Sequence, residues 1–308
     1  NSYGSTTHLQ LTSTSQTNSD YSIATTYFTY PDDITINSDS PSGDAKAIKQ
    51  LRENHYKDTP IQILKTTKVP SHQEFVTSGL LSTFHENSLL PKQILVLDES
   101  QKELSSFVMP SVNNSGNLVF DSLFKPRILF SKYDEMANLI EQSKFGDIKY
   151  AYKWGYNGEF PIAEAINCSP EDFFYTSFED AISNVSSQAK TGLKGSTGTL
   201  AISLPKPGSY ALTYWRKGSS TSWELVEQVV SSNITIGGSG WIIDEVRLVP
   251  QTARMSTFTY SPGKGLTSKT DHNNITTYYD YDDFGRLGEI RDADNNLLKI
   301  MSYHLTSD

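Results

Sequence analysis

Few side chains of this chain stand in the spacings that catalysis requires. The six histidines, at positions 8, 55, 72, 85, 272 and 304, form no HExxH pair, so the sequence does not indicate a hydrolytic zinc site. No serine lies in a GxSxG turn and no GxxxxGKS/T phosphate-binding loop occurs, while Cys168, the single cysteine, has no histidine near it in sequence. A glycosidase carboxylate pair has no spacing of its own, because its defining distance is set by the fold. We therefore expect a protein that is not an enzyme.

One acidic segment, Asp292 to Asn296, begins like the calcium loop of an EF-hand. The spacing then fails, because Leu297 stands where the loop needs glycine and Tyr303 stands where it needs glutamate. We interpret the segment as a hairpin turn.

Three tryptophans are candidates for a sugar-binding platform, since the faces of pyranose rings pack on aromatic planes. Trp215 lies in the alternating segment ALTYWRK, where core packing is the commoner fate of a tryptophan. Trp223 and Trp241 are therefore the predicted ligand-binding residues.

The charge and composition exclude several classes of protein. The chain has 26 Lys and Arg against 35 Asp and Glu, a net charge of −9, which disfavours nucleic acid as a partner. No apolar run approaches the roughly 18 residues of a membrane helix. One cysteine allows no intrachain disulfide and leaves the cellular compartment open. The chain starts at Asn1 without Met or a signal sequence, so we expect an excised piece or a mature product.

The apolar periodicity predicts a mostly β chain with one short helix. Tyr21 to Tyr30 alternates aromatic and small polar residues, as a strand does. The segment after Asp44, AKAIKQLREN, places Ala45, Ile48 and Leu51 on one helical face. Residues 125–157 read as consecutive antiparallel hairpins.

A change of texture near residue 170 predicts a domain boundary. Residues 173–250 consist of short alternating stretches bounded by Gly and Pro, which argues for a small β-sandwich. After it, Tyr260, Tyr281 and Tyr303 recur at spacings of 21 and 22, the sign of stacked supersecondary units.

The unit from Tyr281 to Leu287, YDDFGRL, resembles the YD repeat of bacterial RHS-repeat proteins. Gly285 permits the tight positive-φ bend of its turn, and Asn295 stands where the second turn of the family usually carries Gly. A worn copy, Tyr133 to Leu139, lacks the glycine. The resemblance implies a shell or spiral of β-hairpins that is secreted or displayed on the bacterial cell surface, in some relatives around a C-terminal toxin. None of the 13 prolines follows Asp, so the self-cleaving segment of toxin-releasing relatives is missing, and we expect no cargo.

The segment 173–250 resembles a carbohydrate-binding-module jelly roll inserted between the repeats. The matching positions are Phe178-Glu179, Lys190 to Gly192, Tyr210 to Trp215 and Ile243 to Val246. Such modules often hold a structural calcium ion between carboxylates of the first and last strands. The resemblance thus implies a structural Ca²⁺ bound by Glu179 and Asp244. Calcium takes six to eight oxygen ligands, mostly from carboxylates and carbonyls, and two acidic residues that meet at a strand crossing would supply the first of them.

The sequence thus predicts an all-β fold of RHS-type antiparallel hairpin repeats with an inserted jelly-roll sandwich and one short helix. Its predicted regions are a degenerate repeat region (1–170), the jelly-roll module (171–252) and C-terminal YD repeats (253–308). The predicted function is a non-enzymatic secreted or cell-surface scaffold or interaction protein. Two alternatives stay open: a glycan-binding adhesin acting through the module, and a fragment of a toxin-delivery shell. The partners implied are a glycan or cell-surface protein, the rest of a larger RHS polypeptide, or secretion machinery, and neither nucleic acid nor a membrane-spanning segment.

Overall fold

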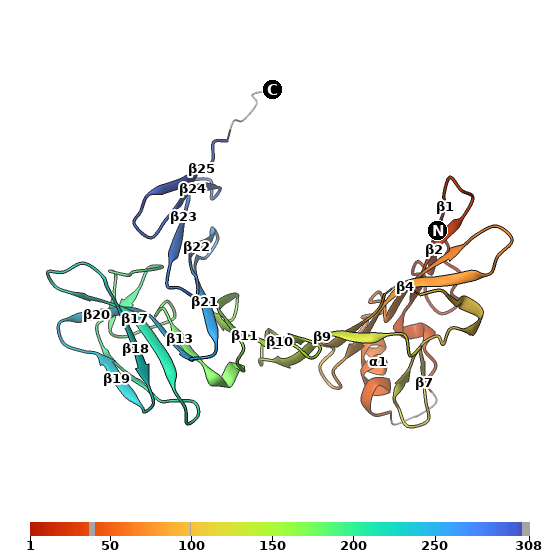
Figure 1. Cartoon of the computed structure of the whole chain (residues 1–308), viewed down its shortest axis with the longest axis horizontal. Coiled ribbons are helices and arrows are strands. Elements are labelled where there is room, and N and C mark those ends of the chain that lie inside the picture. The colour runs from red at the N-terminus through yellow and green to blue at the C-terminus, as the bar shows by residue number, and fades with distance from the viewer. Residues whose placement is uncertain (37–40, 99, 304–308) are drawn as a thin grey trace. The chain divides into compact units, whose positions relative to one another are not determined.

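Antiparallel strands are the main secondary structure and far outweigh the helices, so the predicted all-β class is confirmed (Figure 1). The structure is a computed structural model and describes residues 1–36, 41–98 and 100–303. The last residues of the predicted repeat region 253–308, 304–308, lie outside this description. Contacts divide the chain into two compact units: residues 1–131 with 143–147, and residues 132–142 with 148–308. The predicted boundary near residue 170 and the three predicted regions are a different division and stay a prediction.

The first unit is a sheet covered on one face by the predicted helix. Its elements are β1 (Ser13–Thr17), β2 (Ile23–Thr29), the 3-10 helix η1 (Pro31–Asp33), α1 (Gly43–Glu53), β3 (Gln62–Lys68), β4 (Glu74–Phe84), β5 (Pro91–Leu97), β6 (Lys102–Glu103), the 3-10 helix η2 (Leu104–Ser106), β7 (Ser111–Val112), β8 (Leu118–Val119) and most of β9 (Lys125–Tyr133). The main strands follow the order β1-β2-β3-β4-β5-β9. Ile48 and Leu51 of α1 share a buried core with Leu64 and Val76 of the sheet, which is why the apolar face of this short helix is stable.

The second unit combines a ladder of hairpins with an inserted module. Its elements are β10 (Leu139–Lys144), β11 (Lys149–Gly155), β12 (Phe160–Ile166), the 3-10 helix η3 (Pro170–Asp172), β13 (Phe174–Thr176), β14 (Val185–Ser186), β15 (Gly195–Ser196), β16 (Thr199–Ile202), β17 (Tyr210–Gly218), β18 (Glu224–Val230), β19 (Ile234–Gly237), β20 (Trp241–Pro250), β21 (Arg254–Ser261), β22 (Gly265–Thr270), β23 (Thr276–Tyr281), β24 (Leu287–Arg291) and β25 (Leu297–Ile300). The ladder runs β10-β11-β12-β21-β22-β23-β24-β25, and its C-terminal hairpins are drawn in blue in Figure 1.

The strand pairing shows where the module enters the ladder. β12 pairs directly with β21, from Ala163 opposite Thr257 to Ile166 opposite Arg254. The side chain of Asn167 donates a hydrogen bond to the carbonyl of Thr252 (3.0 Å), which holds the two ends of the excursion together. The segment between β12 and β21 is therefore an insertion that leaves the ladder and returns to the neighbouring position.

The module consists of two sheets with a common core. One sheet has the order β14-β15-β20-β17-β18 with β13 also paired to β20, and the other is the pair β16-β19. Ile202 and Ile236 of the small sheet share a buried core with Leu212, Ile243 and Leu248 of the large one. This arrangement agrees with a sandwich, while the jelly-roll topology stays a prediction.

Four turns of the ladder share one hydrogen-bonding pattern. An aspartate carboxylate accepts hydrogen bonds from the amides two and four residues later, and the residue three positions later has a positive φ. The four examples in the ladder are Asp134 with Ala137 (φ 66°), Asp271 with Asn274 (62°), Asp282 with Gly285 (74°) and Asp292 with Asn295 (67°). The aspartate organises the turn and the third residue must enter the left-handed region, which favours Gly and Asn.

A second repeated contact joins neighbouring hairpins. Tyr281 donates its hydroxyl to the carbonyl of Leu266 (2.9 Å), and Tyr303 donates to the carbonyl of Leu287 (2.9 Å). Leu266 and Leu287 are the cross-strand partners of Tyr260 and Tyr281, so each tyrosine bonds to the closing residue of the preceding hairpin. The spacing of the tyrosines therefore corresponds to a contact between successive hairpins.

Candidate functional site

Glu179, one predicted calcium ligand, lies just after β13 and is held by a loop of the module. Its Oε1 accepts hydrogen bonds from the amides of Leu193 (2.8 Å) and Lys194 (2.9 Å). Gly192 makes this approach possible, because its φ is +64° and a Cβ there would lie 2.3 Å from Glu179 Oε1. Burial raises the pKa of Glu179, and the two amide hydrogen bonds oppose that shift.

Asp244, the other predicted ligand, is bound by the same loop. This fully buried carboxylate accepts hydrogen bonds at Oδ2 from the amides of Lys190 (2.7 Å) and Thr191 (3.0 Å), and at Oδ1 from the amide of Glu245 (2.7 Å). Burial raises the pKa of Asp244 well above its ordinary value, and the charge of Glu245 acts in the same direction. The segment Lys190–Lys194 therefore binds both predicted ligands through its backbone.

The groups around these carboxylates do not fit a calcium ion. Calcium needs six to eight oxygen ligands, whereas most neighbours here are N–H donors. The ammonium of Lys194 also donates to the carbonyls of Glu179 (2.7 Å) and Ala181 (3.3 Å), two oxygens that a cation near Glu179 would use. In the described part of the chain, no group of three or more His, Cys, Asp or Glu side chains is placed to hold a metal.

Glu245 is the central residue of a buried polar network. It belongs to the segment Ile243 to Val246 that was named from the sequence, but no role was predicted for it. Its Oε1 accepts hydrogen bonds from the hydroxyls of Tyr175 (2.6 Å) and Thr191 (2.7 Å), and its Oε2 accepts one from Thr257 (2.8 Å). Burial and the charge of Glu245 raise the pKa of Tyr175 well above its ordinary value. Because Thr257 lies on β21, this carboxylate joins the module to the ladder.

A register shift lies at the two consecutive buried acidic residues of β20, a strand that is buried from Ile243 to Leu248. The pairing of β17 with β20 is irregular between Thr213 and Trp215, opposite Glu245, which has a φ of +51°. Regular alternation would send Asp244 and Glu245 to opposite faces of the sheet. With the bulge, both side chains contact Thr191, whereas Ile243 and Val246 on either side of them enter the apolar core of the module.

Arg247 extends the network to a turn of the ladder. Its guanidinium donates to Asn274 Oδ1 (2.6 Å), to the carbonyl of Asp271 (3.0 Å) and to the carbonyl of Met255. Tyr278 of β23 adds a further link by donating its hydroxyl to the carbonyl of Lys190 (3.0 Å). Asn274 therefore serves twice, as the positive-φ residue of a hairpin turn and as an acceptor for the module.

The two predicted ligand-binding tryptophans lie near one end of the large sheet of the module. Trp241 opens β20 opposite Gly218, and Trp223 immediately precedes β18. The guanidinium of Arg216 lies 4.6 Å from the ring centroid of Trp241 and also pairs with Glu224 (3.0 Å). One face of the Trp241 ring is thus already covered by a cation. Sugar binding by these residues stays a prediction.

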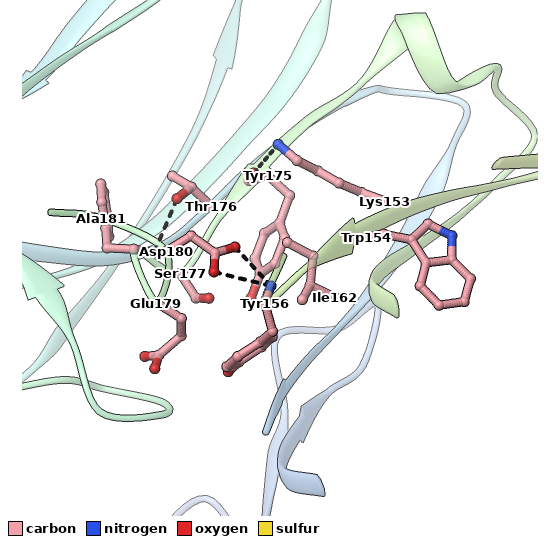
Figure 2. A pocket seen from close by; sticks show the side chains of 11 residues that line it. Lys153, Trp154, Tyr156, Ile162, Tyr175, Thr176, Ser177, Glu179, Asp180 and Ala181 are labelled. Carbon is pink, nitrogen blue, oxygen red and sulfur yellow. Dashed lines mark hydrogen bonds between the residues drawn. The ribbon is translucent and has the colours of Figure 1, made fainter. Parts of the chain in front are cut away.

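A pocket of about 270 Å³ lies where the module leaves the ladder (Figure 2). Lys153 of β11, Tyr156 of the turn after β11 and Ile162 of β12 are among its walls, and the segment 175–181 supplies the other side. Lys153 donates to the carbonyl of Tyr175 (2.7 Å), and both oxygens of Asp180 accept from the amide of Tyr156 (3.1 and 2.9 Å). Burial lowers the pKa of Lys153. The charged groups of the pocket therefore bind the protein's own backbone.

The fold and these contacts define an all-β protein in which an inserted two-sheet module is held to a ladder of hairpins by buried polar contacts. No protein-family model and no curated protein matches the chain. Among solved structures, the chain is similar to one described as "Crystal Structure of TcdB2-TccC3", with 10% sequence identity and a TM-score of 0.16, over 89% of this chain and 20% of that one. The chain thus spans about a fifth of the length of the chain it matches. In the described residues, no helix has the length and apolar content needed to cross a membrane.

Proposed function

We propose that this chain is a non-enzymatic scaffold of the RHS type, secreted or displayed on a bacterial cell surface, whose hairpin ladder carries an inserted interaction module. The observation that carries the proposal is the repeated pair of contacts in the ladder: the aspartate-centred turn, and the tyrosine hydroxyl bonded to the preceding hairpin. A hairpin that is hydrogen-bonded to the preceding hairpin can be repeated many times along a chain, and a wall or spiral of hairpins requires such repetition.

The chemistry of the buried acidic groups supports a structural role. Asp244 and Glu245 accept hydrogen bonds from amides and hydroxyls of the protein itself. Groups bound in this way fix the module on the ladder. A catalytic acid or base would instead need to reach a substrate atom within hydrogen-bond distance.

The exposed edge strand of the ladder, β25, is evidence for an interaction partner. β25 presents Leu297, Leu298 and Ile300 to solvent, with exposed fractions of 50%, 60% and 65%. Apolar side chains in a row on an exposed strand are typical of a surface that another strand or protein covers. The rest of a larger RHS polypeptide is the partner that best suits a strand of this kind.

The proposal is tested by where the protein is found in the cells that make it, and by whether protease added outside intact cells can cleave it. The natural gene product, tagged within an exposed turn, is expected to be released by protease treatment of intact cells or found in the medium. Recovery in the cytosol alone would contradict the proposed location, and turnover of a small substrate by the purified chain would contradict a non-enzymatic role.

Two further experiments separate the alternatives. Specific binding on a glycan array that is lost in Trp223→Ala and Trp241→Ala would favour an adhesin. A reading frame that continues past Asp308 into an Asp-Pro-rich cleavage segment would favour a toxin-delivery shell, and a stop codon at that point would exclude it.

A further inference from the structure

We propose that the ammonium of Lys194 is the built-in cation of the module, so that the site implied for calcium works without a metal ion. Lys194 lies one residue before β15, in the loop that also binds Glu179 and Asp244. The inference concerns how the module is stabilised and does not depend on the proposed scaffold function.

The backbone after β13 prepares the site. Phe178 has a φ of +60°, and the amide of Ala181 donates to the carbonyl of Phe178 (2.9 Å), which closes a tight turn. The turn leaves the carbonyls of Glu179 and Ala181 facing the same point, where Lys194 Nζ lies 2.7 Å and 3.3 Å from the two oxygens. A set of backbone carbonyls beside a carboxylate is the kind of site that a hard cation occupies.

The charges at this point favour a cation. Glu179 and Asp180 are adjacent acidic residues, and the positive charge of Lys194 lowers the pKa of Glu179 against the effect of burial. Lys194 binds Glu179 twice, since its amide donates to the carboxylate while its ammonium donates to the carbonyl. The side chain thus supplies the charge and the donors that a metal would otherwise provide.

The first experiment needs no variant. Thermal unfolding of the full chain is followed in excess EGTA and in excess calcium chloride, together with metal analysis of the purified protein. The expected result is the same melting temperature in both solutions and no stoichiometric calcium. A melting temperature that falls in EGTA, or one calcium per chain, would overturn the proposal and support the calcium site at Glu179 and Asp244.

Two variants then test the role of the ammonium. Lys194→Met keeps most of the length of the side chain and removes its charge, which leaves the carbonyls of Glu179 and Ala181 without their donor. A drop of roughly 3 to 6 °C in melting temperature is expected. Lys269→Met is the matched control, because Lys269 is exposed on β22. Equal melting temperatures for the two variants would overturn the proposal.

A third variant separates charge from packing. Lys194→Arg keeps the positive charge and the N–H donors, so its melting temperature is expected to lie closer to that of the wild type than the melting temperature of Lys194→Met does. A Lys194→Arg variant no more stable than Lys194→Met would mean that the positive charge contributes nothing, and would overturn the cation role.

Discussion

Ala137 occupies the position that glycine fills in the best-formed turn of the ladder, and replacing it by glycine is expected to stabilise the protein. Its φ is +66°, close to the +74° of Gly285 in the equivalent turn after Asp282. The left-handed region costs a residue with a Cβ roughly 1 to 2 kcal/mol. Ala137 is exposed, so removing its methyl group sacrifices little burial.

The net effect of Ala137→Gly follows from two opposing contributions. The relief of backbone strain is reduced by the greater freedom of glycine in the unfolded chain, about 0.4 to 1 kcal/mol. We therefore expect a gain of about 0.5 to 1 kcal/mol in the free energy of unfolding, which corresponds to roughly 1 to 4 °C in melting temperature for a unit of this size.

The reverse change, Gly285→Ala, carries the same two contributions with opposite sign and is expected to lower the free energy of unfolding by about 0.5 to 1 kcal/mol. An ideal Cβ on Gly285 would meet nothing within 4 Å, so its cost comes from the backbone angle alone. Gly288 is the matched control, because it lies in β24 with no positive φ and its added Cβ would be 3.6 Å from the nearest atom, the carbonyl oxygen of Asp280. Gly288→Ala is expected to be neutral or slightly stabilising.

The assay is urea denaturation of the full chain, followed by tryptophan fluorescence and analysed for the transition of the second unit. Opposite signs for Ala137→Gly and Gly285→Ala are the expected result. Destabilisation by Ala137→Gly, or a Gly285→Ala variant as stable as Gly288→Ala, would refute the equivalence of the two turns and with it the interpretation of residues 133–139 as a worn repeat.

Three other measurements probe the module and the turns. Gly192→Ala should lower the free energy of unfolding by more than about 2 kcal/mol, as measured by urea denaturation, because the new Cβ would collide with Glu179 Oε1 at a positive φ; an unchanged midpoint would disprove that contact. Glu245→Gln should cost about 1 to 3 kcal/mol, measured the same way, since the amide cannot accept from all three hydroxyls with equal strength, and a neutral effect would contradict the buried network. Asp282 and Asp292 have lowered pKa values, the first chiefly through the amide of Arg286 and the second through the side chain of Asn296. The stability that they give is present above their unfolded pKa of about 4 and is lost as the pH falls through the lower folded pKa. Asp282→Ala should therefore flatten the acid limb of a profile of melting temperature against pH, and an unaltered limb would argue against the aspartate turn.

The sequence predicted the local elements well, because local rules govern them. β2 and α1 follow from alternation and helical spacing within about ten residues, and the 21-residue period of the tyrosines corresponds to an actual contact from Tyr281 to Leu266. The turns were also readable, since an aspartate followed three residues later by Gly or Asn carries its own physical reason.

Long-range contacts were not readable from the sequence. Asp244 was singled out as a carboxylate, but its partners Lys190 and Thr191 lie more than fifty residues away, and they are backbone amides that leave no trace in residue type. Glu245 was hidden because β20 is buried at every position from Ile243 to Leu248, whereas alternation on a strand with one solvated face predicts an exposed side chain at every second position.

The inserted module and the ladder depend on each other through a few buried polar groups. Arg247 of the module donates a hydrogen bond to Asn274 in a turn of the ladder. Thr257 of the ladder donates one to Glu245 of the module, so each part completes the hydrogen bonds of the other. A buried guanidinium or carboxylate that lost these partners would keep the cost of burial without its compensation. The same contacts that fix the module in place therefore make its separation from the ladder unfavourable.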